Sequence, residues 1–225
     1  MRVLFLVLLL VGCNVDTTGQ SFLGTKYILS PLGEGIAPDT DPLFRTDAFD
    51  CTTFVETVLS GGDVNKLNKI RYKDGVVDFL NRNHFIESDW LINNSDLVEN
   101  VSYKYATTDV RHVKIDKANW LKVVHNIDAD FDVADVALEY IPYDNLHYFD
   151  TDNVLIVLFV ADKPKIRDII GTDLAVYHMG LLLPGGVFRH ASSDKQMVTD
   201  VDFYEYVAQQ KQNKTNLGIV LVGIK

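Results

Sequence analysis

Asp50-Cys51-Thr52-Thr53-Phe54-Val55-Glu56 is the stretch that decides the fold, because it places a thiol where a helix is expected to begin. Asp50 is a good N-cap and Gly61-Gly62 a good stop. Between them hydrophobic residues recur at helical spacing, namely Phe54, Val55, Val58 and Leu59. Cys51 then occupies the first helical position, where unpaired backbone N–H groups and the positive end of the helix dipole favour a thiolate. The stretch therefore predicts a nucleophilic cysteine.

Two histidines lie far downstream in a predicted β-hairpin. Val176 to Leu183 and Val187 to Ser192 read as strands around the turn Pro184-Gly185-Gly186. Centring the turn on Gly185 makes His178 and His190 diagonal neighbours on one face, whereas centring it on Pro184 places them directly opposite each other. Opposed Cβ atoms lie about 4.5–5.5 Å apart and diagonal ones about 7–8 Å, so the rings can hydrogen-bond in both registers. This geometry offers His190 the role of orienting a catalytic base.

With these residues in place, the chain resembles the NlpC/p60 superfamily of papain-like cell-wall hydrolases. More narrowly, it is similar to the branch catalogued as domain of unknown function 1460, described as N-acetylmuramoyl-L-alanine amidase-like. The matching segments follow the family's order along nearly the whole chain after the export signal. They are Phe22 to Tyr27, Asp50 to Glu56, Ile70 to Gly75, Asn83 to Phe85 with Asp89-Trp90, His178 to Gly180, and His190 to Ser193.

The resemblance implies roles for individual residues. Cys51 matches the family's nucleophile, His178 its base and His190 its third polar residue, while Tyr27 matches a tyrosine beside the nucleophile. It also implies an α+β papain-like fold, in which the helix bearing the nucleophile packs on an antiparallel sheet. The implied reaction is hydrolysis of the amide between N-acetylmuramic acid and L-alanine in peptidoglycan or muropeptides.

Two alternatives remain open. An endopeptidase that cuts γ-D-glutamyl-diamino acid bonds in stem peptides would use the same three residues, so the motif does not decide between the two bonds. An inactive wall-binding lipoprotein would keep the fold as a scaffold, although the intact Cys51, His178 and His190 argue against it.

The chain also departs from the family pattern, since Thr151-Asp152 and Tyr177 stand where Gly-Asp and a small residue are common.

The rest of the chain predicts strands after a long middle region. Val154 to Val160 is a continuous apolar run of strand length and should be a central strand buried on both faces, and Leu217 to Ile224 resembles a closing strand. Helix first and antiparallel strands after give an α+β fold. The middle region, about 63–150, is an elaboration whose position favours cleft walls, with three residues as possible substrate contacts: Arg71, His84 and Trp90.

The first residues predict export. Arg2 precedes an apolar run, Val3 to Val11, which is too short to span a bilayer and fits the core of a signal peptide. Leu10-Val11-Gly12-Cys13 resembles a lipobox, so residues 1–12 are the expected signal and Cys13 the expected lipidated residue. Residues 13–21 would then tether a catalytic domain at 22–225. Asn14 favours the outer membrane, and a lipidated Cys13 leaves Cys51 unable to pair with it.

The charge balance limits the partners. The chain has 21 basic and 31 acidic residues and a formal charge of −10, which opposes binding to nucleic acid or to anionic lipid head groups. A muropeptide or peptidoglycan substrate must then be recognised by shape and hydrogen bonds. The membrane is expected as a partner only through the lipid anchor of an exported lipoprotein, in the outer membrane or another periplasm-facing membrane.

Neither a metal nor another cofactor is expected. A zinc amidase needs three spaced protein ligands around an open position, and the sequence has neither His-Glu-x-x-His nor a clustered histidine pair. Asp128, Asp130, Asp132 and Glu139 match part of a calcium-loop spacing. However, Val133 stands where the sharp turn needs glycine.

Overall fold

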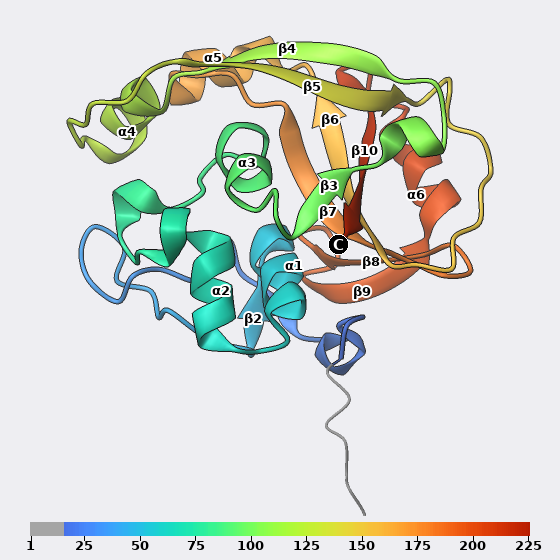
Figure 1. Cartoon of the computed structure of the whole chain (residues 1–225), viewed down its shortest axis with the longest axis horizontal. Coiled ribbons are helices and arrows are strands. Elements are labelled where there is room, and N and C mark those ends of the chain that lie inside the picture. The colour runs from blue at the N-terminus through green and yellow to red at the C-terminus, as the bar shows by residue number, and fades with distance from the viewer. Residues whose placement is uncertain (1–15) are drawn as a thin grey trace, which may run out of the picture.

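The computed structural model describes residues 16–225, which form a mixed α+β fold around one curled sheet (Figure 1). The strands in this range are β1 (Lys26–Tyr27), β2 (Ala48–Phe49), β3 (Val98–Asn100), β4 (Asp109–Ile115), β5 (Ala134–Pro142), β6 (Leu155–Ala161), β7 (Val176–Leu183), β8 (Val187–Ser192), β9 (Met197–Asp202) and β10 (Asn216–Ile224). The α-helices are α1 (Cys51–Ser60), α2 (Val64–Arg71), α3 (Leu91–Asn93), α4 (Lys117–His125), α5 (Pro164–Ile170) and α6 (Phe203–Gln210). The shorter helical turns are η1 (Gln20–Phe22), η2 (Lys73–Gly75), η3 (Phe79–Asn81), η4 (Ile86–Trp90) and η5 (Ser102–Lys104).

The sheet is antiparallel apart from the short parallel pair β1–β2. Its strand order is β2-β1-β9-β8-β7-β6-β10-β5-β4, and β3 pairs with β10 outside this path. The expected α+β class with an antiparallel sheet is therefore confirmed. Because β6 to β9 are neighbours in space as well as in sequence, the hairpin β7–β8 lies in the middle of the sheet.

The apolar run expected as a central strand is β6, and all of its residues, Leu155–Ala161, are buried. It lies between β7 and β10, so both of its edges are hydrogen-bonded and its side chains enter the core on both faces. The expected closing strand is β10, Asn216–Ile224, but it lies inside the sheet, where β5 and β3 also pair with it. The last strand is therefore held from both sides.

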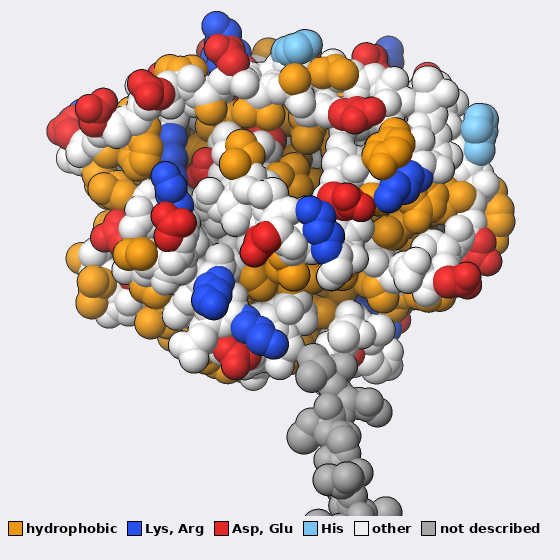
Figure 2. Space-filling model, viewed as in Figure 1, with side chains coloured by type: hydrophobic (Ala, Val, Ile, Leu, Met, Phe, Trp, Pro, Cys, Tyr) orange, Lys and Arg blue, Asp and Glu red, His pale blue; other side chains and the backbone are white. Residues whose placement is uncertain are grey.

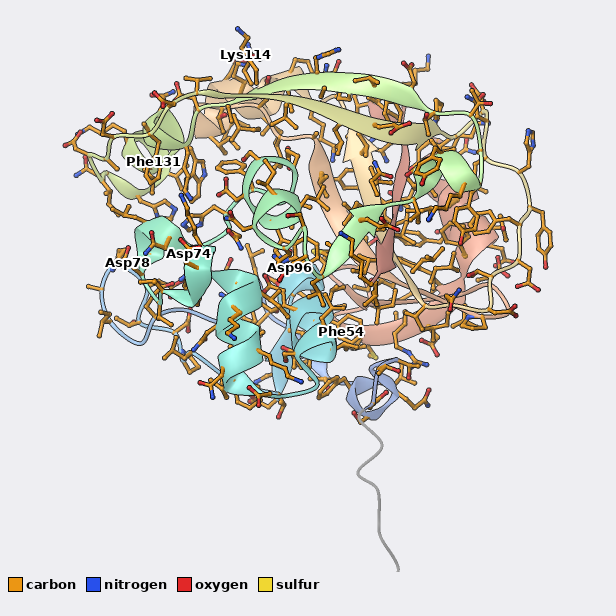
Figure 3. All side chains as sticks on the ribbon, viewed as in Figure 1. Phe54, Asp74, Asp78, Asp96, Lys114 and Phe131 are labelled. Atoms are coloured by element: carbon orange, nitrogen blue, oxygen red, sulfur yellow. The ribbon has the colours of Figure 1, made fainter. Side chains whose placement is uncertain are left out.

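Helix α1 begins and ends as its sequence predicts. The Asp50 carboxylate accepts the backbone N–H of Thr53 at 2.8 Å, and Gly61 ends the helix in the left-handed conformation with φ of 61°. Phe54, Val55 and Val58 are buried in one core cluster with strand residues such as Met179 and Ala191. Figure 3 shows Phe54 on the side of α1 that faces the sheet. A second cluster of buried hydrophobic residues includes Phe203 and Val207, through which helix α6 packs on the sheet.

The middle region, expected as an elaboration at about 63–150, is part of the same sheet. Its strands β4 and β5 extend the sheet beyond β10, while α2, α3 and the turn η4 pack beside α1. Figure 1 shows these helices on the same side of the molecule as α1. The region therefore contributes to the core as well as to the walls of the cleft described below.

The segment before residue 22 differs from expectation. Asp16 to Ser21 was expected to be part of a tether, but the backbone carbonyl of Thr18 and the side chain of Gln20 accept hydrogen bonds from buried Arg189, at 3.1 and 2.7 Å. Gly19 lies so close to α1 that an added Cβ would meet the Phe54 ring at 2.8 Å. The segment is therefore docked on the domain. The expected signal peptide and Cys13 lie outside the described residues, and none of the helices in residues 16–225 has the length and apolarity that a bilayer span needs.

Candidate active site

The hairpin has the register obtained by centring its turn on Gly185. Leu181 pairs with Arg189 and Leu183 with Val187, which makes the two histidines diagonal neighbours. Nε2 of His178 lies 2.7 Å from Nδ1 of His190, so the rings share a hydrogen bond. The expected contact between the two histidines is therefore present, in the first of the two registers.

A β-bulge lies directly before His178. In the β6–β7 ladder Phe159 pairs with His178 and Val160 pairs with Val176, so Tyr177 is an extra residue on β7. A bulge bends the strand and re-aims neighbouring side chains, and bulges are common beside active sites. Tyr177, which departs from the family pattern in the sequence, therefore occupies the position that sets the local direction of His178.

Cys51 and His178 line the same pocket, which has a volume of about 130 Å³. Its other lining residues are Thr52, Asn83, His84, Ile86, Leu174, Val176, Tyr177 and Met179. In the described part of the chain no hydrogen bond joins the Cys51 sulfur to His178; the sulfur lies 3.9 Å from the Thr52 hydroxyl. Catalytic hydrogen bonds are often long before substrate binds, so the shared pocket is the relevant observation.

Burial shifts the pKa of both groups in the direction that favours the neutral form. Burial, followed by the Asp50 charge, raises the pKa of the Cys51 thiol to about 12, although backbone N–H groups of Met179 and Thr52 act in the opposite direction. Burial, followed by proximity to His190, lowers the pKa of His178 to about 3. Burial therefore opposes the thiolate that the helix start favours. The chemistry that fits is proton transfer from a thiol to a neutral imidazole.

The hydrogen bond between the histidines assigns the two nitrogens of His178. Nε2 is bonded to His190, so Nδ1 is the nitrogen left for the thiol proton. To accept that proton Nδ1 must carry a lone pair, which requires Nε2 to donate its hydrogen to Nδ1 of His190. Burial lowers the pKa of His190 to about 4, so this ring is also neutral and can accept.

An aromatic shell holds this pair, and the sequence did not reveal it. The ring centroid of His190 lies 4.8 Å from that of Phe188 and 5.0 Å from that of Tyr206, while Phe159 lies 5.8 Å from His178. Phe159 and Phe188 are fully buried. The spacing of Phe188 and His190 on one strand face was a usable signal. Tyr206, on α6, was not predictable because its approach depends on the packing of that helix.

A second pocket of about 140 Å³ shares Thr52, Asn83 and His84 with the first, so the cleft extends to both sides of the helix start. Its lining is mainly polar, and Arg71 and Glu56 lie in it. These two side chains form a buried ion pair, with Nη1 of Arg71 2.7 Å from Oε2 of Glu56. Arg71 thus lines the cleft as expected, while Glu56 was missed even though it follows Thr52 by one helical turn.

His84 also lines both pockets. Its Nε2 lies 2.7 Å from the Phe79 carbonyl oxygen, which can only accept, so Nε2 carries the hydrogen and Nδ1 is an acceptor. Burial, followed by the charge of Lys117, lowers the pKa of His84 well below its ordinary value. His84 is therefore a neutral hydrogen-bond acceptor in the wall of the cleft.

Tyr27 and Trp90 occupy different environments. Burial raises the pKa of Tyr27 to about 12, with smaller effects of neighbouring Cys51 and Asp50 in the same direction. Trp90 is fully buried, and its indole N–H donates to Oε1 of Glu56 at 3.1 Å. Its burial keeps Trp90 off the surface of the cleft, so the expected substrate contact is not supported. Trp90 instead holds the ion pair beneath the cleft.

Another pocket lies away from these residues. It has a volume of about 540 Å³, lies between α2 and residues 93–97, and has Asp74 and Asp96, labelled in Figure 3, among its lining residues.

Within residues 16–225 no group of three or more His, Cys, Asp or Glu side chains could hold a metal ion. Figure 2 shows Lys and Arg side chains interspersed with Asp and Glu on the face in view.

Comparison with known proteins identifies a family and a shared fold. Residues 17–218 match the AmiA-like family model, described as N-acetylmuramoyl-L-alanine amidase-like. A Legionella pneumophila protein of the DUF1460 family is 25% identical, with a TM-score of 0.83 over 93% of this chain and 87% of its own. A Bacteroides uniformis structure named an N-acetylmuramoyl-L-alanine amidase is 22% identical, with a TM-score of 0.71 over 94% and 97%.

A third structure has a different name. It comes from Bacteroides fragilis, is named as a xylanase, and is 23% identical, with a TM-score of 0.70 over 92% of this chain and 99% of its own. At this level of identity the likeness concerns the fold alone. No curated protein matches the chain.

Proposed function

Since this chain belongs to the AmiA-like family of N-acetylmuramoyl-L-alanine amidase-like proteins, we propose that it hydrolyses the amide between N-acetylmuramic acid and L-alanine in muropeptides. The observation that carries the proposal is the hydrogen-bonded pair His178–His190 next to a pocket that His178 shares with Cys51. A thiol, a neutral base and an orienting partner are the components of nucleophilic acyl transfer. We further propose that the fold is of the papain-like NlpC/p60 type.

The reaction begins with attack by Cys51. Nδ1 of His178 takes the thiol proton as Sγ bonds to the carbonyl carbon of the lactyl group, and backbone N–H groups at the start of α1 hold the oxyanion. When the intermediate collapses, the C–N bond breaks and His178 gives the proton to the leaving L-alanine nitrogen. The products of this half-reaction are a thioester on Cys51 and a peptide with a free amine.

Water completes the reaction. His178 removes a proton from water, the hydroxyl oxygen bonds to the thioester carbonyl carbon, and the thiol leaves with the proton returned by His178. His190 keeps the ring of His178 in the required tautomer throughout. When His178 becomes a cation, the neutral Nδ1 of His190 accepts its Nε2 hydrogen and stabilises that charge.

The cleft fits an amide flanked by a small apolar group and a polar one. Beside His178 the pocket is small and lined by apolar residues such as Leu174 and Val176, which suits the methyl of a lactyl or alanyl unit. On the other side the lining is polar, and we propose Arg71 and Nδ1 of His84 as contacts for hydroxyl and amide groups. Tyr27 is proposed as a further contact beside Cys51.

A glycosidase is a poorer fit to the same cleft. Glycoside hydrolysis commonly requires two carboxyl groups on either side of the scissile bond. The carboxylates that line this cleft are Asp50, which caps α1, and Glu56, which pairs with buried Arg71. Both are committed to holding the fold. The thiol–imidazole pair is therefore the better supported chemistry.

We also propose that the protein is an exported lipoprotein anchored through Cys13 in the outer membrane or another periplasm-facing membrane. This proposal rests on the sequence, in which an apolar run of signal-peptide length ends in Leu10-Val11-Gly12-Cys13. Residues 1–12 would be removed and Cys13 acylated. The catalytic domain would then act on fragments present at that membrane.

The test is to incubate the purified protein with defined disaccharide-peptides and to weigh the products. We expect intact N-acetylmuramic acid and a peptide whose L-alanine has a free amine, with no products from Cys51→Ala. Cleavage between γ-D-glutamate and the diamino acid would instead identify an endopeptidase. No cleavage by the folded wild-type protein would favour a wall-binding lipoprotein.

A further inference from the structure

The turn η4, Ile86–Trp90, contacts both elements that carry the proposed catalytic residues. It is a π-helical turn, in which the backbone N–H of Trp90 donates to the Phe85 carbonyl at 3.0 Å, and such turns are frequent at functional sites. Trp90 reaches α1 through its hydrogen bond with Glu56. Glu87 reaches the segment before β7, where it accepts the backbone N–H of Ala175 at 2.6 Å. One turn thus joins the helix of the nucleophile to the strand of the base.

Glu87 is an unusual side chain for this position because it is buried. It is 2% exposed, and in the described part of the chain its Oε2 has no hydrogen-bond partner. Burial raises the pKa of Glu87, against the effect of backbone N–H groups such as that of Ala175. A buried polar group is expensive unless it has a structural or chemical role, so the role of Glu87 needs an explanation.

Its partner Ala175 lies next to the irregularity in the β6–β7 ladder. The bulge at Tyr177 interrupts regular pairing between Phe159–His178 and Val160–Val176. Ala175 is held by two partners on the N-terminal side of the bulge, because its carbonyl accepts the N–H of Ala161 at 2.9 Å and its own N–H donates to Glu87. The contact with Glu87 therefore adds a second anchor to the chain three residues before His178, beside the one that β6 supplies.

We infer that Glu87 is a positioning residue for His178. By holding the N–H of Ala175 it sets the path of the chain into the bulge, and with it the direction in which Nδ1 of His178 faces Cys51. The inference rests on the proposed function for the role given to His178. Ile86, the neighbour of Glu87, lines the catalytic pocket with Leu174 and Val176, so the same contact also shapes the pocket wall.

The experiment compares Glu87→Ala with Glu87→Gln in the full-length protein, and Glu99→Ala, at an exposed site on β3, is the matched control. Two readouts are used: kcat and KM on a disaccharide-peptide, and the ring ¹⁵N signals of His178 without substrate. Glu87→Ala should lower kcat at least tenfold, leave KM within threefold and shift the His178 signals. Glu87→Gln keeps an acceptor for Ala175 and should stay within threefold of the wild-type kcat.

A folded Glu87→Ala variant with wild-type kcat and unchanged His178 signals would overturn the inference. If Glu87→Ala does not fold, Glu87→Asp replaces it, because its shorter side chain withdraws the carboxyl group from Ala175, and the same results are expected. The two proposals fail separately. A wild-type protein that cleaves no muropeptide contradicts the proposed function, whereas the His178 signals still decide whether Glu87 sets that ring.

Discussion

Nε2 of His178 lies 2.7 Å from Nδ1 of His190, which leaves Nδ1 of His178 as the nitrogen available to Cys51. The contact depends on the register of β7 and β8, in which the two histidines are diagonal neighbours on one face. It separates the roles of two residues of the same type. In the proposed mechanism His178 moves the proton, and His190 determines which nitrogen of His178 is free to do so.

The first prediction concerns these two roles. His178→Ala should lower kcat/KM by about 10⁴-fold or more, since the base is lost. His190→Asn should lose only about 10–100-fold, because its amide can still bond to Nε2 of His178. Steady-state kinetics on a disaccharide-peptide measures both. Equal losses in the two variants, or full activity in His178→Ala, would show that the roles are assigned wrongly.

The second prediction concerns acid stability. The pKa values of His178 and His190 are lowered from 6.5 to about 3 and about 4. The stability that the neutral rings contribute is thus fully present above pH 6.5 and is lost as the pH falls toward 4 and below. The free energy of unfolding, measured in urea, should therefore decrease from pH 6.5 to 4.

The control for this pH series replaces both His178 and His190 with Asn, which should reduce the change of unfolding free energy with pH. Replacing an exposed histidine, in His147→Gln, should leave that change as it is in the wild-type protein. His84, whose pKa is also lowered, contributes equally in all three proteins. A double variant with the wild-type slope would contradict the assignment.

The third prediction concerns the ion pair under the cleft. Glu56→Gln leaves the buried guanidinium of Arg71 without its countercharge and should cost about 3–5 kcal/mol of unfolding free energy. Glu56→Gln combined with Arg71→Met should cost less, because no unpaired charge remains. The matched surface change Glu99→Gln removes an exposed pair with Lys104 and should cost far less, because water screens that pair. Equal costs for Glu56→Gln and Glu99→Gln would contradict the burial argument.

The fourth prediction concerns the N-terminus. Mass spectrometry of the mature protein should find an acylated Cys13, and Cys13→Ser should abolish the modification. Deleting residues 1–13 should release an active protein from the membrane. Deleting residues 1–21 should in addition cost about 1–3 kcal/mol, because it removes the acceptors of Arg189 and the packing of Gly19. An unmodified terminus at another residue would exclude the lipoprotein.

Local signals in the sequence were sufficient for the elements that carry the site. The Asp50 cap and Gly61 define α1, and Pro184-Gly185-Gly186 defines the hairpin, because capping and turn formation depend on neighbouring residues. The predicted first and last residues of both strands therefore match the structure, which has β7 at Val176–Leu183 and β8 at Val187–Ser192. The continuous apolar pattern also identified β6 as a buried central strand.

Contacts between distant segments could not be predicted in this way. Glu87 meets Ala175 across 88 positions, and Arg189 meets Thr18 across 171, so no local pattern reports either contact. The same holds for Trp90, whose hydrogen bond with Glu56 buries it beneath the cleft. The effect of burial on the Cys51 pKa could not be predicted either, because burial is a property of the tertiary structure.

The central claim is that Cys51 forms a thioester with the acyl group of the substrate. Acid quenching of the reaction in the first turnovers, followed by proteolysis and mass spectrometry, tests it directly. The peptide that contains Cys51 should gain the mass of an N-acetylmuramoyl acyl group, and the gain should disappear on treatment with hydroxylamine. A γ-D-glutamyl-containing adduct would contradict the proposed bond. Sustained hydrolysis by Cys51→Ala would contradict the mechanism itself.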